Sequence, residues 1–179
     1  CAFIYKYGMG KVTLPEGMTW NEIRDMAMKS LVFGYSTHKA NKLKITSNNA
    51  HWGSTSKHDA VWESSLWAMS LAYSTHFLKG ELTQKQMGYI YNMLKAECNY
   101  ELERDVPTGF KGDTKAEENG WEVDVLAATL GLFPDDKLAK QWFERMRLFA
   151  INSYSHDKDA YNNTVSDTWY DNTTVADLY

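Results

Sequence analysis

Apolar residues recur at helical spacing along most of this chain, and the pattern alternates between two kinds of helix. The stretches 20–35, 84–104 and 135–154 each carry one apolar stripe, whereas 56–79 and 113–132 are apolar on two sides. A helix with one apolar stripe covers a core, and a helix that is apolar on several sides is buried. The order along the chain therefore predicts outer, inner, outer, inner and outer helices, paired as hairpins in two layers.

Helical hairpins in two layers are the arrangement of an α/α toroid or solenoid, which is an all-α fold. A closed toroid of about six hairpins needs roughly twice the length of this chain of 179 residues. We therefore expect a single domain over residues 1–179 that forms about half of an (α/α) toroid, its N-terminal part. The polar residues 36–51 are expected to hold no regular element, and 156–179 to form an irregular polar segment.

Start and stop signals flank several of these helices. Thr19 followed by Glu22 has the spacing of a capping box, which predicts a helix start. Thr83 is expected to cap the third helix, and Pro134 to end the fourth. The apolar rows are Ile23, Ala27, Leu31 and Tyr35 in the first helix and Met87, Ile90, Leu94 and Cys98 in the third.

The composition narrows the classes of protein that this chain can represent. Hydrophobic residues make up 44% and charged residues 23%, which fits a folded globular domain. No run of about 18 apolar residues occurs, so no transmembrane segment is expected. The net charge of −4 and the lack of a basic stripe give no reason to expect a nucleic acid partner.

The cysteines suggest neither a disulfide framework nor a metal site. Cys1 and Cys98 are the only two, and neither has the spacing of metal ligands. We expect no metal and no cofactor, although the Asp, Glu and Asn clusters could accept a calcium ion. Because the chain starts at Cys1, one expectation is an extracellular or periplasmic protein with a lipid anchor on that residue. The other expectation is an arbitrary fragment start.

The most informative run extends from Gly112 to Trp121, where carboxylates, a lysine and an asparagine open the fourth helix. Acids in a first turn favour the helix dipole, which explains Asp113 without any function. It does not explain the adjacent pair Glu117 and Glu118. Paired carboxyl groups with shifted pKa values are what acid/base chemistry on glycosides needs.

The helical positions of these two carboxyl groups separate their expected roles. Adjacent residues on a helix point about 100° apart, so at most one of the two faces a substrate. Glu118 shares a polar face with Lys115 and Asn119 and is expected to contact the substrate. Glu117 lies between the apolar stripes, as does Asp124, and is expected to have a raised pKa.

A second candidate group precedes the second helix. If the inner helices are parallel, their N-termini share one rim, and His51 and Trp52 would meet the Gly112–Trp121 run there. His51 would then serve as an acid/base and Trp52 as a stacking platform; the alternative is a capping histidine beside a core tryptophan. The candidate catalytic residues are Glu117, Glu118 and His51, and the candidate substrate-binding residues are Trp52, Asp113, Lys115, Asn119 and Trp121.

Two polar residues late in the third helix have a weaker claim to a role. Glu97 and Asn99 could support a site on the same rim, but we expect them on the solvated face of their helix.

The Gly112–Trp121 run, with the following Leu132-Phe133-Pro134-Asp135, resembles a motif of uncharacterised α/α-toroid proteins. These proteins are similar in architecture to heparinase-type lyases and toroid glycoside hydrolases. The run Trp62–Ala68 and the triplet Glu97-Cys98-Asn99 fit the same resemblance, which covers about residues 50–179. It implies the fold, while no catalytic residue of a characterised lyase maps onto a matching position.

These observations lead to one main expectation about function. It is a polysaccharide hydrolase or lyase that acts on a polysaccharide or oligosaccharide by carboxylate acid/base chemistry in the toroid cleft. The alternative is a non-catalytic helical scaffold, or a glycan- or protein-binding module, in which the carboxylates cap helices and the aromatic residues pack. An isoprenoid-type toroid enzyme is disfavoured because the sequence has no Asp-rich metal motif.

Overall fold

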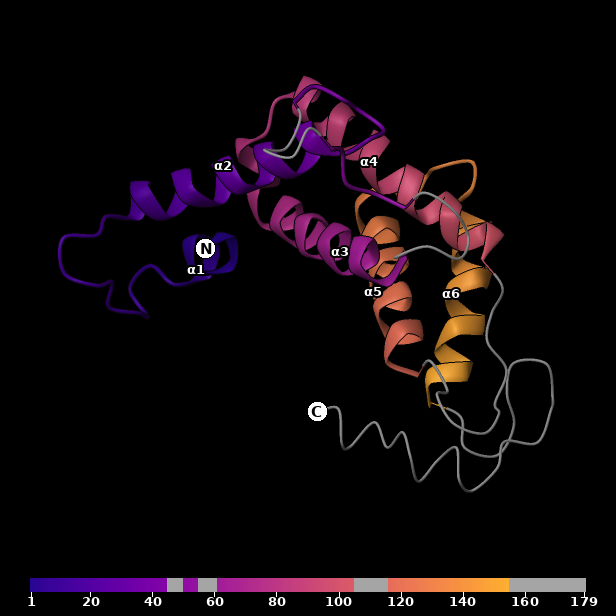
Figure 1. Ribbon diagram of the computed structural model, residues 1–179. Coiled ribbons are helices and arrows are strands. Elements are labelled where there is room, and N and C mark those ends of the chain that lie inside the picture. The colour runs from indigo at the N-terminus through magenta and orange to yellow at the C-terminus, as the bar shows by residue number, and fades with distance from the viewer. Residues whose placement is uncertain (45–49, 55–60, 105–115, 155–179) are drawn as a thin grey trace. The chain divides into compact units, whose positions relative to one another are not determined.

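The computed structural model of the protein describes residues 1–44, 50–54, 61–104 and 116–154 (Figure 1). The regular elements of the described residues are all helices, which confirms the all-α class. These residues contain no strand, and one isolated bridge joins His38 and Trp52. The helices are α1 (Ala2–Tyr7), α2 (Trp20–Thr37), α3 (Val61–Leu78), the 3-10 helix η1 (Lys79–Glu81), α4 (Gln84–Glu103), α5 (Ala116–Leu132) and α6 (Ala139–Tyr154).

The chain divides into two compact units. One comprises residues 1–53 and 70–96, and the other comprises residues 54–69 and 97–179. None of the described helices combines the length and the apolar character that crossing a bilayer would require.

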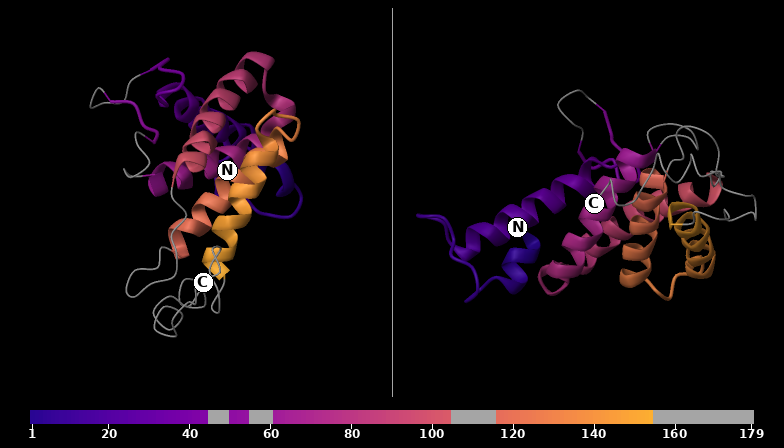
Figure 2. Two further views of the ribbon diagram at one scale, coloured as in Figure 1. Left: turned by 90° about the vertical axis from the view of Figure 1, so that its right-hand side faces the viewer. Right: turned by 90° about the horizontal axis from the view of Figure 1, so that it is seen from below.

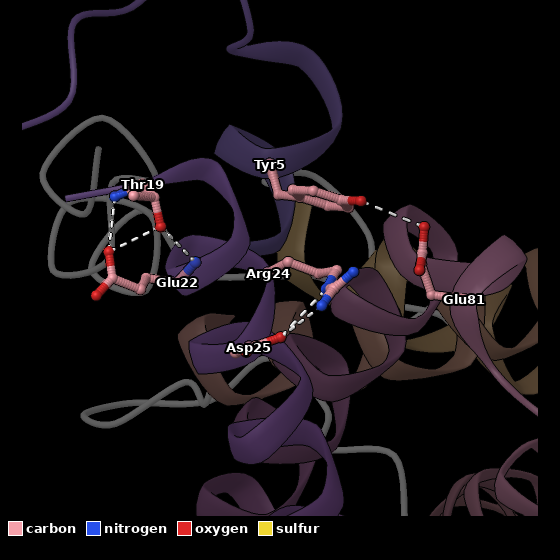
Figure 3. A network of polar contacts seen from close by, with 6 residues as sticks. All are labelled: Tyr5, Thr19, Glu22, Arg24, Asp25 and Glu81. Atoms are coloured by element: carbon pink, nitrogen blue, oxygen red, sulfur yellow. Dashed lines mark hydrogen bonds and ion pairs between the residues drawn. The ribbon is translucent and has the colours of Figure 1, made fainter.

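In the first unit, α2 begins at the predicted capping box. The Thr19 hydroxyl accepts the Glu22 backbone N–H at 3.2 Å, and the Glu22 carboxylate accepts the Thr19 backbone N–H at 2.7 Å (Figure 3). The predicted apolar row of this helix is confirmed, because Ile23, Ala27, Leu31 and Tyr35 are all buried.

A capping box also begins α4. The Thr83 hydroxyl accepts the Gln86 backbone N–H at 3.3 Å, and the Gln86 side chain accepts the Thr83 backbone N–H at 2.9 Å. On α4, Ile90 and Leu94 are buried as predicted. The Tyr35 ring stacks on that of Tyr89 at 5.7 Å between centroids, which joins α2 to α4 within the first unit.

The short helix α1 and the bridge that follows α2 carry no long apolar period. Helix α1 packs on α2, and the Tyr5 hydroxyl donates a hydrogen bond to Glu81 at 3.2 Å (Figure 3). A segment of this length is too short to show an amphipathic pattern, so its helix is set by these contacts.

In the second unit, α5 and α6 form an antiparallel hairpin (Figures 1 and 2). Helix α6 starts at Ala139, later than the predicted start at 135, because the Asp136 carboxylate accepts the Leu138 backbone N–H at 2.8 Å and holds a turn there. The predicted starts of α3 and α5 lie outside the described residues. The core contains Cys98, Leu126, Trp142 and Phe149, all fully buried.

Candidate functional site

The second unit buries an unusual number of polar side chains. Glu97 and Glu101 of α4 and Asn119 and Glu122 of α5 each have 0% of their surface exposed. Carboxyl groups are almost never fully buried unless they are paired. Apolar packing alone does not account for this group, so it is the candidate site.

The helical spacing of α4 brings its two carboxyl groups inside. The buried row that holds Leu94 and Cys98 continues through Glu97 and Glu101, which lie three residues beyond each of them. The prediction that Glu97 lies on the solvated face is therefore wrong. Its position on the row outweighs its polar character, because hydrogen bonds replace the water that it loses.

On α5, the face predicted to be polar is largely buried. Asn119 and Glu122 are fully buried, whereas the Glu118 side chain keeps 20% of its surface exposed. Glu118 is thus the most exposed carboxyl group of the cluster among the described residues.

Glu97 is held by a serine that precedes α3. The Ser54 backbone N–H donates to Glu97 Oε1 at 3.0 Å, and the Ser54 hydroxyl donates to Oε2 at 2.5 Å. Both oxygens of this buried carboxyl group therefore accept hydrogen bonds.

Glu101 is less well satisfied. The Ser65 hydroxyl of α3 donates to Glu101 Oε1 at 3.0 Å, and Oε2 has no hydrogen-bond partner among the described residues. Burial raises the pKa of Glu101 to about 8; the charge of Glu97 also raises it, while Arg104 and the Ser65 hydrogen bond oppose the shift.

Arg104 connects the two helices through its guanidinium group. Its Nη1 forms an ion pair with Glu122 Oε1, and its Nη2 lies 3.6 Å from Glu118 Oε2. Burial raises the pKa of Glu122 well above its ordinary value, with Glu101 adding to the shift and Arg104 opposing it. The Arg104 guanidinium is thus the cationic partner of both the buried Glu122 and the partly exposed Glu118.

A second arginine fixes the end of α4. The Arg145 guanidinium of α6 donates to the backbone carbonyl oxygens of Arg104 at 2.7 Å and Leu102 at 2.8 Å. The Asn99 side chain accepts the Trp142 indole N–H at 3.2 Å, which adds a further link between α4 and α6. These contacts position Arg104 beside α5.

His51 and Trp52 have structural contacts in the first unit. His51 Nδ1 lies 3.1 Å from the Thr37 carbonyl oxygen, and the Trp52 indole N–H donates to the Gly34 carbonyl oxygen at 2.9 Å. The Trp52 ring meets the buried His38 imidazole edge-on at 4.6 Å. These contacts with the last turn of α2 favour the alternative of a capping histidine beside a packed tryptophan, and the catalytic and stacking roles stay predictions.

The remaining predicted site residues are only partly described. Asp113 and Lys115 lie outside the described residues, and Glu117 lies in the first turn of α5 with its side chain also outside them. Trp121 is half-buried. The predicted partial burial of Asp124 is confirmed, and burial raises its pKa.

Sequence reasoning missed Glu101, Arg104 and Glu122 as site residues. The available signal was the spacing of Glu101 on the buried row of α4, together with the spacing of four residues between Glu118 and Glu122.

An open hollow in the first unit makes a weaker site. It has a volume of about 340 Å³ and is lined by acidic residues and methionines. The carboxylates of Glu22 and Asp25 that line it are already bonded to Thr19 and Arg24 (Figure 3).

The chemistry of the cluster is that of carboxyl groups and a guanidinium. Within the described part of the chain, no three His, Cys, Asp or Glu side chains are grouped to hold a metal ion. A comparison with protein-family models, with curated proteins and with solved structures found no match. The site is therefore interpreted from its own geometry.

Proposed function

We propose that the protein is a carbohydrate-active enzyme, a polysaccharide hydrolase or lyase, in which Glu118 contacts the substrate and Arg104 positions it. The observation that carries this proposal is the sharing of the Arg104 guanidinium between the partly exposed Glu118 and the buried Glu122. In this arrangement Glu118 has access to solvent, and the Arg104 guanidinium that holds it is itself anchored by the buried Glu122.

The environments of the carboxyl groups support acid/base chemistry. Burial raises the pKa of Glu101 to about 8, and the partly exposed Glu118 lies beside the Arg104 guanidinium. Carboxyl groups whose surroundings separate their protonation states are the general requirement for glycoside cleavage. Trp121, about one turn beyond Glu118, would offer a platform for a sugar ring.

Activity assays on the full chain test this proposal. Anionic and neutral polysaccharides are incubated with the protein, and the products are measured. New ultraviolet absorbance from an unsaturated uronate indicates a lyase, and new reducing ends without that absorbance indicate a hydrolase. Glu118→Gln should lower kcat/KM by about 10²–10⁴-fold, with a loss of stability below about 1 kcal/mol. Glu144→Gln, which changes an exposed carboxylate of α6, is the matched control.

The second candidate is a non-catalytic helical scaffold or binding module. The observation that favours it is the complete burial of Glu101 and Glu122 with Ser65 and Arg104 as their partners, which fits a structural role. Glycan binding without cleavage, with equal affinity for the Glu118→Gln variant and the native protein, would support this alternative over the enzyme.

A further inference from the structure

The buried carboxyl groups of the second unit exceed the cations that face them. Glu118 and Glu122 form ion pairs with the guanidinium of Arg104, and the charge of this guanidinium also acts on Glu101. The guanidinium of Arg145 donates to backbone carbonyl oxygens at the end of α4. With all three carboxyl groups ionised, three negative charges would face these two guanidinium groups, and the Arg145 group is already hydrogen-bonded to backbone oxygens.

Burial makes such an arrangement strongly unfavourable. Glu101 and Glu122 are both 0% exposed, and Arg104 forms its ion pair with Glu122. The remaining Glu101 has one hydrogen bond, from Ser65, and an unpartnered Oε2 within the described part of the chain. A buried carboxyl group in this position becomes neutral by binding a proton rather than remaining ionised without a counterion.

We propose that the two buried carboxyl groups of Glu101 and Glu122 together carry one proton in the folded protein at neutral pH, and that this proton stabilises the packing of α4 against α5. The inference does not depend on the proposed function, because it concerns the folded state alone. The proton is assigned to the pair because both carboxyl groups are fully buried and Arg104 forms its ion pair with Glu122.

The surroundings of the pair agree with a bound proton. Burial raises the pKa of both groups; the charge of Glu97 raises the pKa of Glu101 further, and the charge of Glu101 raises that of Glu122. The groups that face the pair are the Ser65 hydroxyl from α3, Glu97, the neutral Cys98 thiol and Arg104 from α4, Glu118 from α5 and Arg145 from α6. These include two further carboxylates, so deprotonation of the pair would add negative charge to an acidic region.

The proton makes stability depend on pH with a defined sign. The pKa of Glu101 is about 8 in the folded protein, above its ordinary value of 4.5. Between these values the folded protein binds more protons than the unfolded chain, so its stability falls as the pH rises, and it levels off above the upper value. One proton makes the unfolding equilibrium constant rise about tenfold per pH unit in this window.

Urea unfolding from pH 5 to pH 9 tests the inference. The unfolding equilibrium constant of the native protein should rise with pH as described. In the Glu101→Gln/Glu122→Gln double variant, the slope of this rise should be smaller by about one proton, because a glutamine amide does not titrate. Glu144→Gln should follow the native curve, since that carboxylate is exposed. Parallel curves for the native protein and the double variant would overturn the proposal.

Infrared spectroscopy of the native protein gives a second test that needs no variant to fold. In deuterated water at neutral pH, the folded protein should show the carbonyl absorption of a protonated carboxyl group, and this absorption should disappear on unfolding. A folded protein without the absorption would contradict the inference. Neither test measures enzymatic activity, so a negative result would not count against the proposed function, which is tested by the activity assay.

Discussion

The Ser54 hydroxyl donates a 2.5 Å hydrogen bond to the fully buried carboxyl group of Glu97. Removing this donor in Ser54→Ala should lower the free energy of unfolding by about 1.5–3 kcal/mol, because a buried carboxyl oxygen loses a charge-assisted hydrogen bond. Urea denaturation measures the loss. Ser74→Ala is the control, since its hydroxyl donates only to the Ser70 carbonyl oxygen one turn earlier, and it should change stability by less than about 0.5 kcal/mol.

Substitution of Arg104 and substitution of its partly exposed partner Glu118 should change stability by very different amounts. Arg104→Met leaves the buried Glu122 without its cation and should cost about 3–5 kcal/mol of stability. Glu118→Gln should cost less than about 1 kcal/mol, because its contact with Arg104 is 3.6 Å long and its side chain is 20% exposed. Thermal and urea unfolding measure both variants. Because Arg104→Met removes both ion pairs, equal losses would mean that the pair with Glu118 accounts for the whole effect and would contradict the role of the buried pair.

The sequence predicts the helices well where local chemistry specifies them. Thr19 and Glu22 form the predicted capping box, and the apolar row from Ile23 to Tyr35 is buried as expected. Helix α1 escaped prediction because a short helix depends on packing against α2 and on the bond between Tyr5 and Glu81.

The candidate site was harder to predict because polar character and helical position disagree there. Glu97 and Glu101 occupy the buried row of α4, yet a carboxyl group normally marks a solvated face. These carboxyl groups can be buried because residues from other segments bind them: Ser54 binds Glu97, Ser65 binds Glu101 and Arg104 binds Glu122. Those pairings join residues far apart in sequence, and helical periodicity carries no information about them.

The Arg145 guanidinium caps the end of α4 with two hydrogen bonds from one planar group. Arg145→Lys should therefore cost about 2 kcal/mol, because an ammonium group cannot reproduce the paired geometry of the guanidinium. Arg145→Ala should cost more, since it also removes the contact with the Phe149 ring at 5.9 Å. Arg147→Ala, at a position that is 54% exposed, should change stability by less than about 0.5 kcal/mol under the same urea denaturation. Full rescue by lysine would contradict the cap.

Gly53 lies beside the bridge between His38 and Trp52. Its backbone φ is +125°, a value that residues other than glycine rarely adopt. A Cβ at this position would lie 2.6 Å from His38 Nε2, and His38 is fully buried. Gly53→Ala should therefore cost about 1–3 kcal/mol of stability, through backbone strain and displacement of the imidazole. Gly88→Ala is the matched control, because Gly88 lies within α4 with no atom near its Cβ position, and it should stabilise the protein by about 0.5–1 kcal/mol. Opposite signs in urea unfolding would support the close approach of Gly53 to His38, and a neutral Gly53→Ala would contradict it.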